Sequence, residues 1–150
     1  MSLVGKEAIG FELPDSNGNI VSLKNFKGKK VLLVFYPGDN TMVCTKQLCS
    51  YSDGFDGFRD LGIEIVGINK DSVDSHKEFG AKHNFKFPLL SDTTGKICEA
   101  YGATGLLGTK RAMFLIDESG KIIFEDITLP VLYKGSEEVL DSIKKILSRK

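Results

Sequence analysis

The sequence predicts an α/β fold of three layers, with helices on both faces of a central mixed β-sheet. The first observation is an apolar run at residues 31–36, whose β-branched and aromatic side chains are typical of a buried central strand. The second is a similar run at residues 63–68, which follows a stretch with helical periodicity. A strand, a helix and a strand in this order imply a parallel pair with a right-handed crossover. A chain of 150 residues is long enough for a sizeable core, so residues 1–150 are expected to form one domain.

An N-terminal β-hairpin is expected before the central strand. Residues 11–13 and 20–23 have the composition of short strands. Between them, Asn17 and Gly18 form a strong signal for a tight hairpin turn. The chain then turns once more before it enters the central strand.

A helix is expected directly after the central strand. Pro37 and Gly38 end the strand, and residues 39–41 all favour the N-cap of a helix. Apolar side chains then recur at steps of four and three, as on the buried face of an amphipathic helix. This stripe consists of Cys44, Leu48, Tyr51, Phe55 and Phe58. Cys44 is therefore expected in the first turn of a helix at the C-terminal end of a central strand.

The first turn of a helix favours a reactive cysteine. Its backbone N–H groups have no partners within the helix, and the positive end of the helix dipole lies there. Both features favour the thiolate, which is the nucleophilic form of cysteine. A cysteine on an apolar stripe can equally be a buried core residue. The position of Cys44 alone leaves both interpretations open.

A second cysteine, Cys49, lies five residues further along the same predicted helix. Five residues correspond to a rise of roughly 7.5 Å and a rotation of about 140°, which places the two Cα atoms roughly 8.6 Å apart. A disulfide needs a Cα separation below ~7 Å. Cys44 and Cys49 can therefore bond only if the first turns of the helix unwind, and otherwise they are two unrelated cysteines.

The later segments continue the alternation of helices and strands. The expected elements are a helix from Asp71 or Ser72 to about His83, a short strand at 87–90, a short helix at 95–101 that holds Cys98, a loop at 104–110, strands at 111–116 and 121–124, and a helix at 136–148. The last two strands form a second hairpin, which makes the sheet mixed. A βαβ unit followed by a ββα unit is the order of the thioredoxin fold, so a thioredoxin-like fold is predicted.

Both histidines of the chain, His76 and His83, lie on one predicted helix and share a face with Phe79. We interpret them as partly exposed residues on the flank of that helix. Their spacing of seven differs from the spacing of three or four that metal ligands usually have. We expect no metal site and no other cofactor.

The composition excludes several classes of protein. With a formal net charge of zero, 41% hydrophobic and 27% charged residues, the chain resembles a globular protein that binds no nucleic acid. No apolar run approaches the ~18–20 residues of a membrane span. Lys6 and Glu7 interrupt the region where a signal peptide would be apolar. Three cysteines do not suggest a disulfide scaffold, so we expect a cytoplasmic protein with reduced thiols and no membrane partner.

The segment around Cys44 resembles the active site of a known family. Pro37, Thr41 and Cys44 have the spacing of the PxxxTxxC motif of the peroxiredoxins. The longer segment 35–49 resembles the bacterioferritin comigratory protein, or peroxiredoxin Q, subfamily, which often has its second cysteine five residues after the first. The resemblance extends over nearly the whole chain, through segments that include Asp71-Ser72, Ser75-His76-Lys77, residues 87–92, Ala100-Tyr101-Gly102, Arg111 and residues 114–117. The family has the thioredoxin fold.

The resemblance implies a thiol peroxidase that reduces hydrogen peroxide and organic hydroperoxides. Cys44 would attack the peroxide and become a sulfenic acid. Thr41, the backbone N–H groups near Cys44 and the guanidinium of Arg111 would stabilise the developing charge, and Pro37 would exclude water. Cys49 would then form an intramolecular disulfide, which thioredoxin or a similar dithiol would reduce.

Several alternatives remain open at this point. Cys98 is a rival to Cys49 as the resolving cysteine, or a buried core residue. A redox sensor or thiol-binding protein of the thioredoxin fold without significant peroxidase turnover is the alternative function, and a metal-binding module is a weaker one. Met42 and Val43 stand where the subfamily usually has Pro-Gly, and this departure lies in the part of the helix that would have to open. The protein is expected to be a monomer or a weak homodimer.

Overall fold

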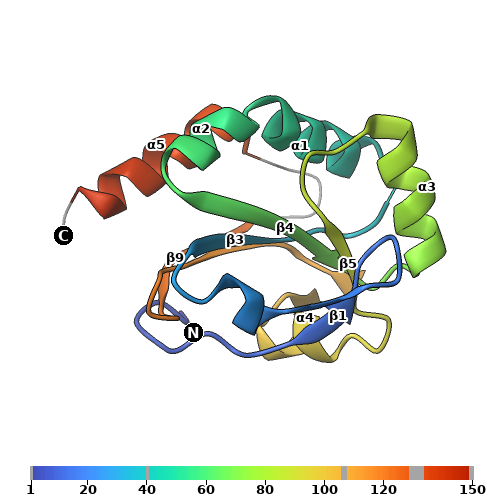
Figure 1. The fold of residues 1–150 in the computed structure, drawn as a ribbon, viewed down its shortest axis with the longest axis horizontal. Helices are drawn as coiled ribbons and strands as arrows, with labels where there is room; N and C mark the ends of the chain where they lie inside the picture. The colour runs from blue at the N-terminus through green and yellow to red at the C-terminus, as the bar shows by residue number, and fades with distance from the viewer. Residues whose placement is uncertain (1, 40, 106–107, 129–133, 149–150) are drawn as a thin grey trace.

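A five-stranded mixed β-sheet forms the centre of the protein (Figure 1). The computed structural model describes residues 2–39, 41–105, 108–128 and 134–148. In spatial order, the strands are β5 (Leu89–Ser91), β4 (Ile63–Asn69), β3 (Lys30–Phe35), β8 (Arg111–Ile116) and β9 (Ile122–Thr128). The pairs β5–β4 and β4–β3 are parallel, whereas β3–β8 and β8–β9 are antiparallel. The predicted mixed sheet, with the run at 31–36 in its centre, is confirmed.

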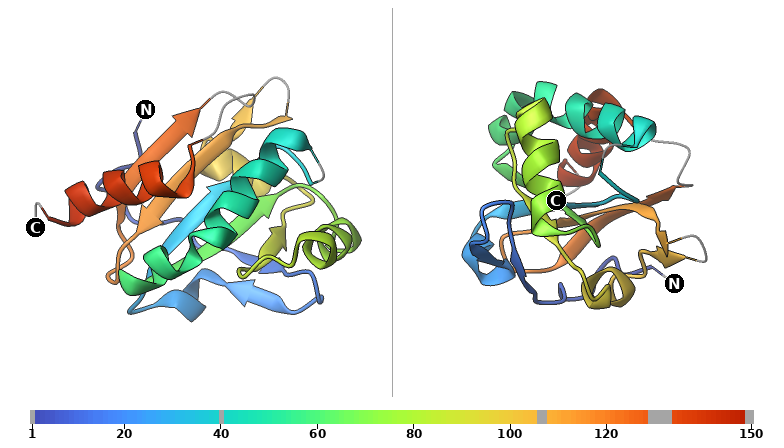
Figure 2. Two further views of the ribbon diagram at one scale, coloured as in Figure 1. Left: turned by 90° about the horizontal axis from the view of Figure 1, so that it is seen from above. Right: turned by 90° about the vertical axis from the view of Figure 1, so that its right-hand side faces the viewer.

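Helices cover both faces of this sheet, as predicted. One face carries α1 (Met42–Asp53), α2 (Phe55–Asp60), α3 (Val73–His83) and α5 (Ser136–Leu147), which lie together above the sheet in Figure 1. The short α4 (Lys96–Ala100) and the N-terminal segment lie on the other face, and the right-hand view of Figure 2 shows the same layering from the side. The fold is thus three-layered and thioredoxin-like.

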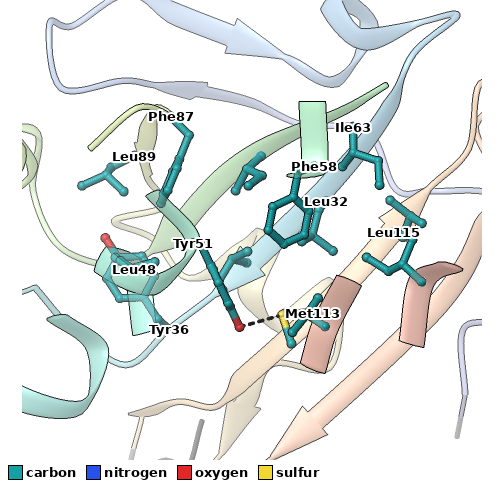
Figure 3. Packing of buried hydrophobic residues seen from close by; sticks show 14 of the residues in the cluster. Leu32, Tyr36, Leu48, Tyr51, Phe58, Ile63, Phe87, Leu89, Met113 and Leu115 are labelled. Atoms are coloured by element: carbon teal, nitrogen blue, oxygen red, sulfur yellow. Dashed lines mark hydrogen bonds between the residues drawn. The ribbon is translucent and has the colours of Figure 1, made fainter. Parts of the chain in front are cut away.

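The sheet separates two hydrophobic cores. Successive side chains of a strand point to opposite faces, so β3 directs Leu32 and Val34 to one core and Leu33 and Phe35 to the other. The first core lies under the four helices; Figure 3 shows Leu32, Phe58 and Leu115 packed in it, with the Tyr51 hydroxyl 3.2 Å from the Met113 sulfur. The second core lies under α4 and the N-terminal segment. The sheet therefore separates a cysteine side chain in one core from the residues of the other core.

The predicted N-terminal hairpin is present, as β1 (Glu12–Pro14) paired with β2 (Ile20–Ser22). It forms a separate two-stranded sheet, which a short 3₁₀ helix, η1 (Leu23–Phe26), follows. Gly18 in the turn has φ +82°, a conformation that glycine adopts most easily.

Two segments differ from the prediction. The loop predicted at 104–110 contains a small antiparallel pair, β6 (Thr104–Gly105) and β7 (Gly108–Thr109), while residues 106–107 lie outside the described part. The apolar stripe from Cys44 to Phe58 belongs to two helices instead of one, because the helix breaks at Gly54.

The break at Gly54 lies where α5 packs closely against α1 and α2. A Cβ atom on Gly54 would lie 2.5 Å from Ser136 Oγ, and one on Gly57 would lie 2.8 Å from a methyl group of Leu140. Both distances are too short for a real contact, so the two glycines let α5 approach. The apolar periodicity identified the buried face but could not reveal this packing. None of the helices in the described residues is long and apolar enough to cross a membrane.

Candidate active site

Cys44 lies where the sequence places it, in the first turn of α1, just beyond the C-terminal end of β3. Thr41 is the N-cap of this helix, with the extended φ of −80° and ψ of 148° that N-caps adopt. The Cys44 side chain is completely buried in the core beneath the helices. A buried thiol at this position needs a cationic or hydrogen-bonding partner if it is to ionise.

Arg111 provides that partner. It is the first residue of β8, and because Ala112 pairs with Phe35, it lies at the end of the sheet where α1 begins. Its side chain is buried, at 2% exposure, and Nη2 donates a hydrogen bond of 3.2 Å to Cys44 Sγ. Arg111 is therefore a buried partner of Cys44 and not a solvated arginine at the end of a strand.

Gln47 is a site residue that the sequence analysis missed. It lies nearly one turn after Cys44 and is completely buried. Its side-chain oxygen accepts a hydrogen bond from Arg111 Nη1, and its side-chain nitrogen donates one of 3.0 Å to the Tyr51 hydroxyl. Tyr51 in turn lies within hydrogen-bonding distance, 2.8 Å, of the Lys134 carbonyl. This chain of contacts orients the guanidinium towards Cys44. In the sequence, the role of Gln47 was indicated by its polar side chain three positions after the cysteine, on the buried side of the helix.

Pro37 and Thr41 lie in the loop between β3 and α1. Pro37 is partly buried next to the end of the strand, whereas Thr41 is exposed. The Thr41 hydroxyl donates a hydrogen bond of 3.1 Å to the Gly38 carbonyl. The hydroxyl proton therefore points into the loop, and an oxygen lone pair is left for another partner.

Asp39 and His76 were also missed as parts of this region. His76 is buried, which contradicts the prediction that both histidines are partly exposed, and only His83 is partly exposed. His76 Nδ1 lies 2.7 Å from a carboxylate oxygen of Asp39. Burial alone would raise the pKa of Asp39, but hydrogen bonds from His76, Tyr36 and Ser75 outweigh it and lower that pKa. Asp39 is therefore ionised at neutral pH, so the loop before Cys44 carries a carboxylate.

Cys49 lies on the same unbroken helix α1 as Cys44, and both thiols are free. It is partly exposed, and its Sγ lies 3.9 Å from His83 Nδ1. Burial raises the pKa of the Cys49 thiol, and the negative charge of Asp53 raises it further. In this conformation, Cys49 is mainly a neutral thiol at neutral pH.

Asp53→Asn should make Cys49 ionise at lower pH, because the substitution removes the charge that opposes the thiolate. At an exposed site, one charge is worth little, so alkylation of Cys49 at pH 7 should become roughly two-fold faster. The measurement is the pH profile of iodoacetamide alkylation at Cys49 in a Cys44→Ser background. Asp56→Asn, which neutralises an exposed carboxylate on α2, is the matched control. Profiles that coincide for Asp53→Asn and the control would contradict this assignment.

Cys98 lies on the opposite side of the sheet from Cys44. It belongs to the core that contains Leu33 and Phe35, whereas Cys44 belongs to the core under α1. Burial, and then the neighbouring Asp92, raise the pKa of Cys98 to about 12. A thiol that is buried, neutral and separated from Cys44 by a β-sheet is poorly placed to react with it.

In the described part of the chain, these residues do not belong to any group of side chains that could bind a metal ion. Within residues 2–39, 41–105, 108–128 and 134–148, no group of three or more histidine, cysteine, aspartate or glutamate side chains is arranged to hold an ion. The contacts of Cys44 are therefore those of a protein thiol beside a guanidinium.

The fold is thioredoxin-like, and a buried arginine contacts a buried cysteine at the start of the helix after the central strand. These features define the class of thiol-dependent oxidoreductases. The model of the AhpC/TSA family matches residues 4–125, and the chain belongs to that family. A Coxiella burnetii protein named bcp is 42% identical over 127 residues, which cover 79% of this chain and 84% of that protein. The chloroplastic peroxiredoxin Q of Sedum lineare is 43% identical over 115 residues, 75% of this chain and 62% of that longer protein.

The solved structures that are similar to this chain include members of the same family. The reduced 2-Cys peroxiredoxin of Plasmodium vivax has a TM-score of 0.90 and 30% identity, with 99% of this chain and 98% of that chain covered. The bacterioferritin comigratory protein of Xanthomonas campestris, whose structures concern alkyl peroxide reduction, has a TM-score of 0.82 and 28% identity over 90% of each chain. The predicted resemblance to the peroxiredoxins, and with it the class of thiol peroxidase, is confirmed.

Proposed function

We propose that this chain reduces hydrogen peroxide and organic hydroperoxides with Cys44 as the attacking thiolate. The observation that carries the proposal is the 3.2 Å hydrogen bond from Arg111 Nη2 to the buried Cys44 Sγ. A guanidinium at this distance favours the negative form of sulfur, and burial keeps the attraction from being screened by solvent. The thiolate is the form of cysteine that peroxides oxidise.

In the first step, the Cys44 thiolate attacks one oxygen of the peroxide, and an S–O bond forms as the O–O bond breaks. Cys44 becomes a sulfenic acid, and the departing oxygen carries the electron pair away as hydroxide or alkoxide, which takes a proton from water. Negative charge therefore moves from sulfur to the departing oxygen. Gln47 holds the Arg111 guanidinium next to the sulfur. From there, the guanidinium can stabilise the negative charge first on the sulfur and then on the departing oxygen.

Thr41 and Pro37 would shape the space around the attacked oxygen. The Thr41 hydroxyl donates its proton to a hydrogen bond with the Gly38 carbonyl, so its oxygen is available to accept a hydrogen bond from the O–H of the peroxide. If Thr41 instead donated to the developing charge, as the family resemblance implies, this hydroxyl would have to rotate. Pro37, partly buried beside the loop, would limit the entry of water.

Cys49 would resolve the sulfenic acid. Its thiolate attacks the Cys44 sulfur, a disulfide forms, and the hydroxyl group leaves and is protonated to water. Both cysteines lie within the intact α1, where their separation is too large for a bond, so the first turns of α1 must unwind. The location of Cys98 behind the sheet supports Cys49 as the resolving residue.

The structure offers a natural limit for this unwinding directly after Cys49. The next three residues each connect α1 to another segment: Ser50 Oγ accepts from the Ser136 amide at 3.0 Å, the Tyr51 hydroxyl lies 2.8 Å from the Lys134 carbonyl, and Ser52 Oγ accepts from the Lys86 amide at 3.1 Å. We propose that these contacts hold residues 50–53, the last turn of α1, while residues 42–49 open.

A dithiol protein such as thioredoxin would reduce the disulfide by thiol–disulfide exchange. Both cysteines come from one helix of one chain, so a monomer or a weak homodimer suffices for the reaction. We place the protein in the cytoplasm, where dithiol reductants keep cysteines reduced, and we propose no nucleic-acid or membrane partner.

Arg111→Ala tests the proposal. The substitution removes the charge and the donor next to Cys44, so oxidation of Cys44 by peroxide should slow by at least ten-fold and by as much as about 10²–10³-fold. The measurement is the stopped-flow rate of Cys44 oxidation at neutral pH, with consumption of peroxide in parallel. Arg111→Lys, which keeps the charge but lacks the planar group that also binds Gln47, should lie between Arg111→Ala and the wild type. An oxidation rate for Arg111→Ala equal to that of the wild type would contradict the role of Arg111.

A further inference from the structure

The carboxylate of Asp39, in the loop that leads into α1, contacts three polar side chains. The Tyr36 hydroxyl donates to one carboxylate oxygen at 2.6 Å. The Ser75 hydroxyl donates to the other at 2.8 Å, and His76 Nδ1 lies 2.7 Å from the same atom. The Asp39 side chain is only 1% exposed, so these groups replace water around its charge.

The contacts of His76 determine its protonation state. Nδ1 faces the Asp39 carboxylate, and Nε2 lies 3.0 Å from the Leu90 carbonyl oxygen. An ionised carboxylate and a carbonyl can only accept hydrogen bonds, so the two contacts form together only when each ring nitrogen carries a proton. The His76 side chain makes both contacts while it is completely buried.

This ion pair connects two segments that are distant in the sequence. Asp39 lies in the loop before Cys44, and His76 lies in the first half of α3. The backbone supports the same connection, because the Asp39 amide donates to the Asp71 carboxylate at 2.7 Å. Asn69 holds Asp71 through two further hydrogen bonds: its side-chain nitrogen donates to the Asp71 carboxylate at 3.1 Å, and its side-chain oxygen accepts from the Asp71 amide at 2.9 Å. The loop is thus fixed by its side chain and its backbone to the end of β4 and the start of α3.

We propose that the buried His76 imidazolium is a positioning residue for Cys44, which fixes the loop at Asp39 and neutralises the Asp39 charge in the segment that leads into α1. This inference rests on the proposed function, since the reaction that it supports is the oxidation of Cys44. The other titratable groups around this ion pair are Asp71 and Tyr36, so His76 provides the positive charge among them. The Tyr36 side chain, whose hydroxyl donates to Asp39, belongs to the same core as Cys44.

The ion pair should therefore affect the two steps of the reaction, oxidation of Cys44 and formation of the disulfide, in different ways. With the ion pair intact, the loop and the first turn of α1 are held in the conformation in which Arg111 contacts Cys44. Without the imidazolium, the loop is released and an uncompensated, buried carboxylate remains in the segment before Cys44. Oxidation of Cys44 should then slow, whereas the unwinding that lets Cys49 reach Cys44 should become easier.

His76→Gln tests this inference in the full-length reduced protein. A displacement of a reacting group by a fraction of an ångström to an ångström can cost about 10²-fold, so we expect Cys44 oxidation to slow by at least ten-fold. Disulfide formation after oxidation should be as fast as in the wild type or faster. Ser75→Ala removes one neutral donor from the same carboxylate and should slow oxidation by less than about three-fold. His83→Gln changes the other histidine of α3 and should leave the oxidation rate unchanged.

Two further measurements separate positioning from a general loss of stability. Nitrogen NMR of the wild type at neutral pH should show protons on both ring nitrogens of His76. Amide hydrogen exchange across residues 41–45 should be faster in His76→Gln than in His83→Gln. Asp39→Asn offers a second variant if His76→Gln does not fold, and it should slow oxidation in the same direction. Neither measurement depends on peroxide, so both test the ion pair even if the wild type proves to have no peroxidase activity.

Specific results would overturn the inference. A His76 ring with one proton would remove the charge on which it rests. A His76→Gln protein that is folded and oxidises Cys44 at the wild-type rate would show that the ion pair is only structural. The same conclusion would follow if oxidation and disulfide formation slowed equally in His76→Gln, since a positioning role predicts opposite or unequal changes in the two steps.

Discussion

Cys44→Ser should abolish peroxide reduction while leaving the fold intact. A serine hydroxyl at this position is not ionised at neutral pH and does not form the sulfenic acid on which the cycle depends. The substitution is nearly isosteric, and Arg111 Nη2 can donate to the serine oxygen in place of the 3.2 Å contact with sulfur. The cost in unfolding free energy should therefore be about 1 kcal/mol, which is an ordinary value for a single substitution.

Consumption of hydrogen peroxide with a dithiol reductant present is the measurement, and circular dichroism and thermal unfolding report the fold. Cys98→Ser is the matched control, because it makes the same change at a buried thiol on the other side of the sheet. It should retain the wild-type rate. If Cys44→Ser consumed peroxide at the wild-type rate, Cys44 would not be the nucleophile.

The sequence predicted those features that depend on neighbouring residues. The central strand, an N-cap within residues 39–41, the placement of Cys44 in the first turn and the short helix around Cys98 all follow from local patterns, and the structure contains each of them. Arg111 was identified by resemblance, but its burial was not, because that depends on how β8 pairs with β3. Position in the fold, rather than composition, makes it a partner of Cys44.

The features that were missed all depend on contacts between distant segments. His76 looks like a surface histidine when only its own helix is considered, and its burial requires the loop that presents Asp39 and the strand that presents the Leu90 carbonyl. The break at Gly54 requires the approach of α5, which lies far along the chain. The sequence indicates the role of Gln47 only through its position after Cys44. The role becomes clear from the hydrogen bond that its side-chain oxygen accepts from Arg111.

Cys49→Ser should remove the intramolecular disulfide and stop turnover with a dithiol after the first oxidation of Cys44. The sulfenic acid would persist, because no other thiol can reach it within the molecule. Under excess peroxide, it should then be oxidised to the sulfinic acid, which a dithiol does not reduce. Mass spectrometry after one equivalent of peroxide, and again after an excess, distinguishes the disulfide, the sulfenic acid and the sulfinic acid.

The comparison with Cys98→Ser decides between the two candidates for resolution. Cys98→Ser should still form the disulfide, because the Cys98 thiol lies in the core beyond the sheet and its pKa is raised to about 12 by burial and Asp92. Cys49 is partly exposed and needs only the first turns of α1 to unwind. A disulfide that persists in Cys49→Ser and is lost in Cys98→Ser would make Cys98 the resolving residue, and α1 would then have no need to open.

The extent of the opening can be measured with the same proteins. Ser50, Tyr51 and Ser52 connect the helix to two other segments, residues 134–136 and Lys86, whereas Met42 at the N-terminal end of α1 is 73% exposed. Helical amides donate to carbonyls four residues earlier, so opening of residues 42–49 also removes the partners of the amides at 50–53. In the oxidised wild type, amide exchange should therefore increase at residues 45–53 and stay slow at Gly54, whose amide donates to the Ser50 carbonyl. The Cys49→Ser protein, which cannot form the disulfide, should keep slow exchange at residues 45–53 after one equivalent of peroxide. Fast exchange at Gly54 in the oxidised wild type would show that disulfide formation unfolds the complete helix and breaks its contact with α5.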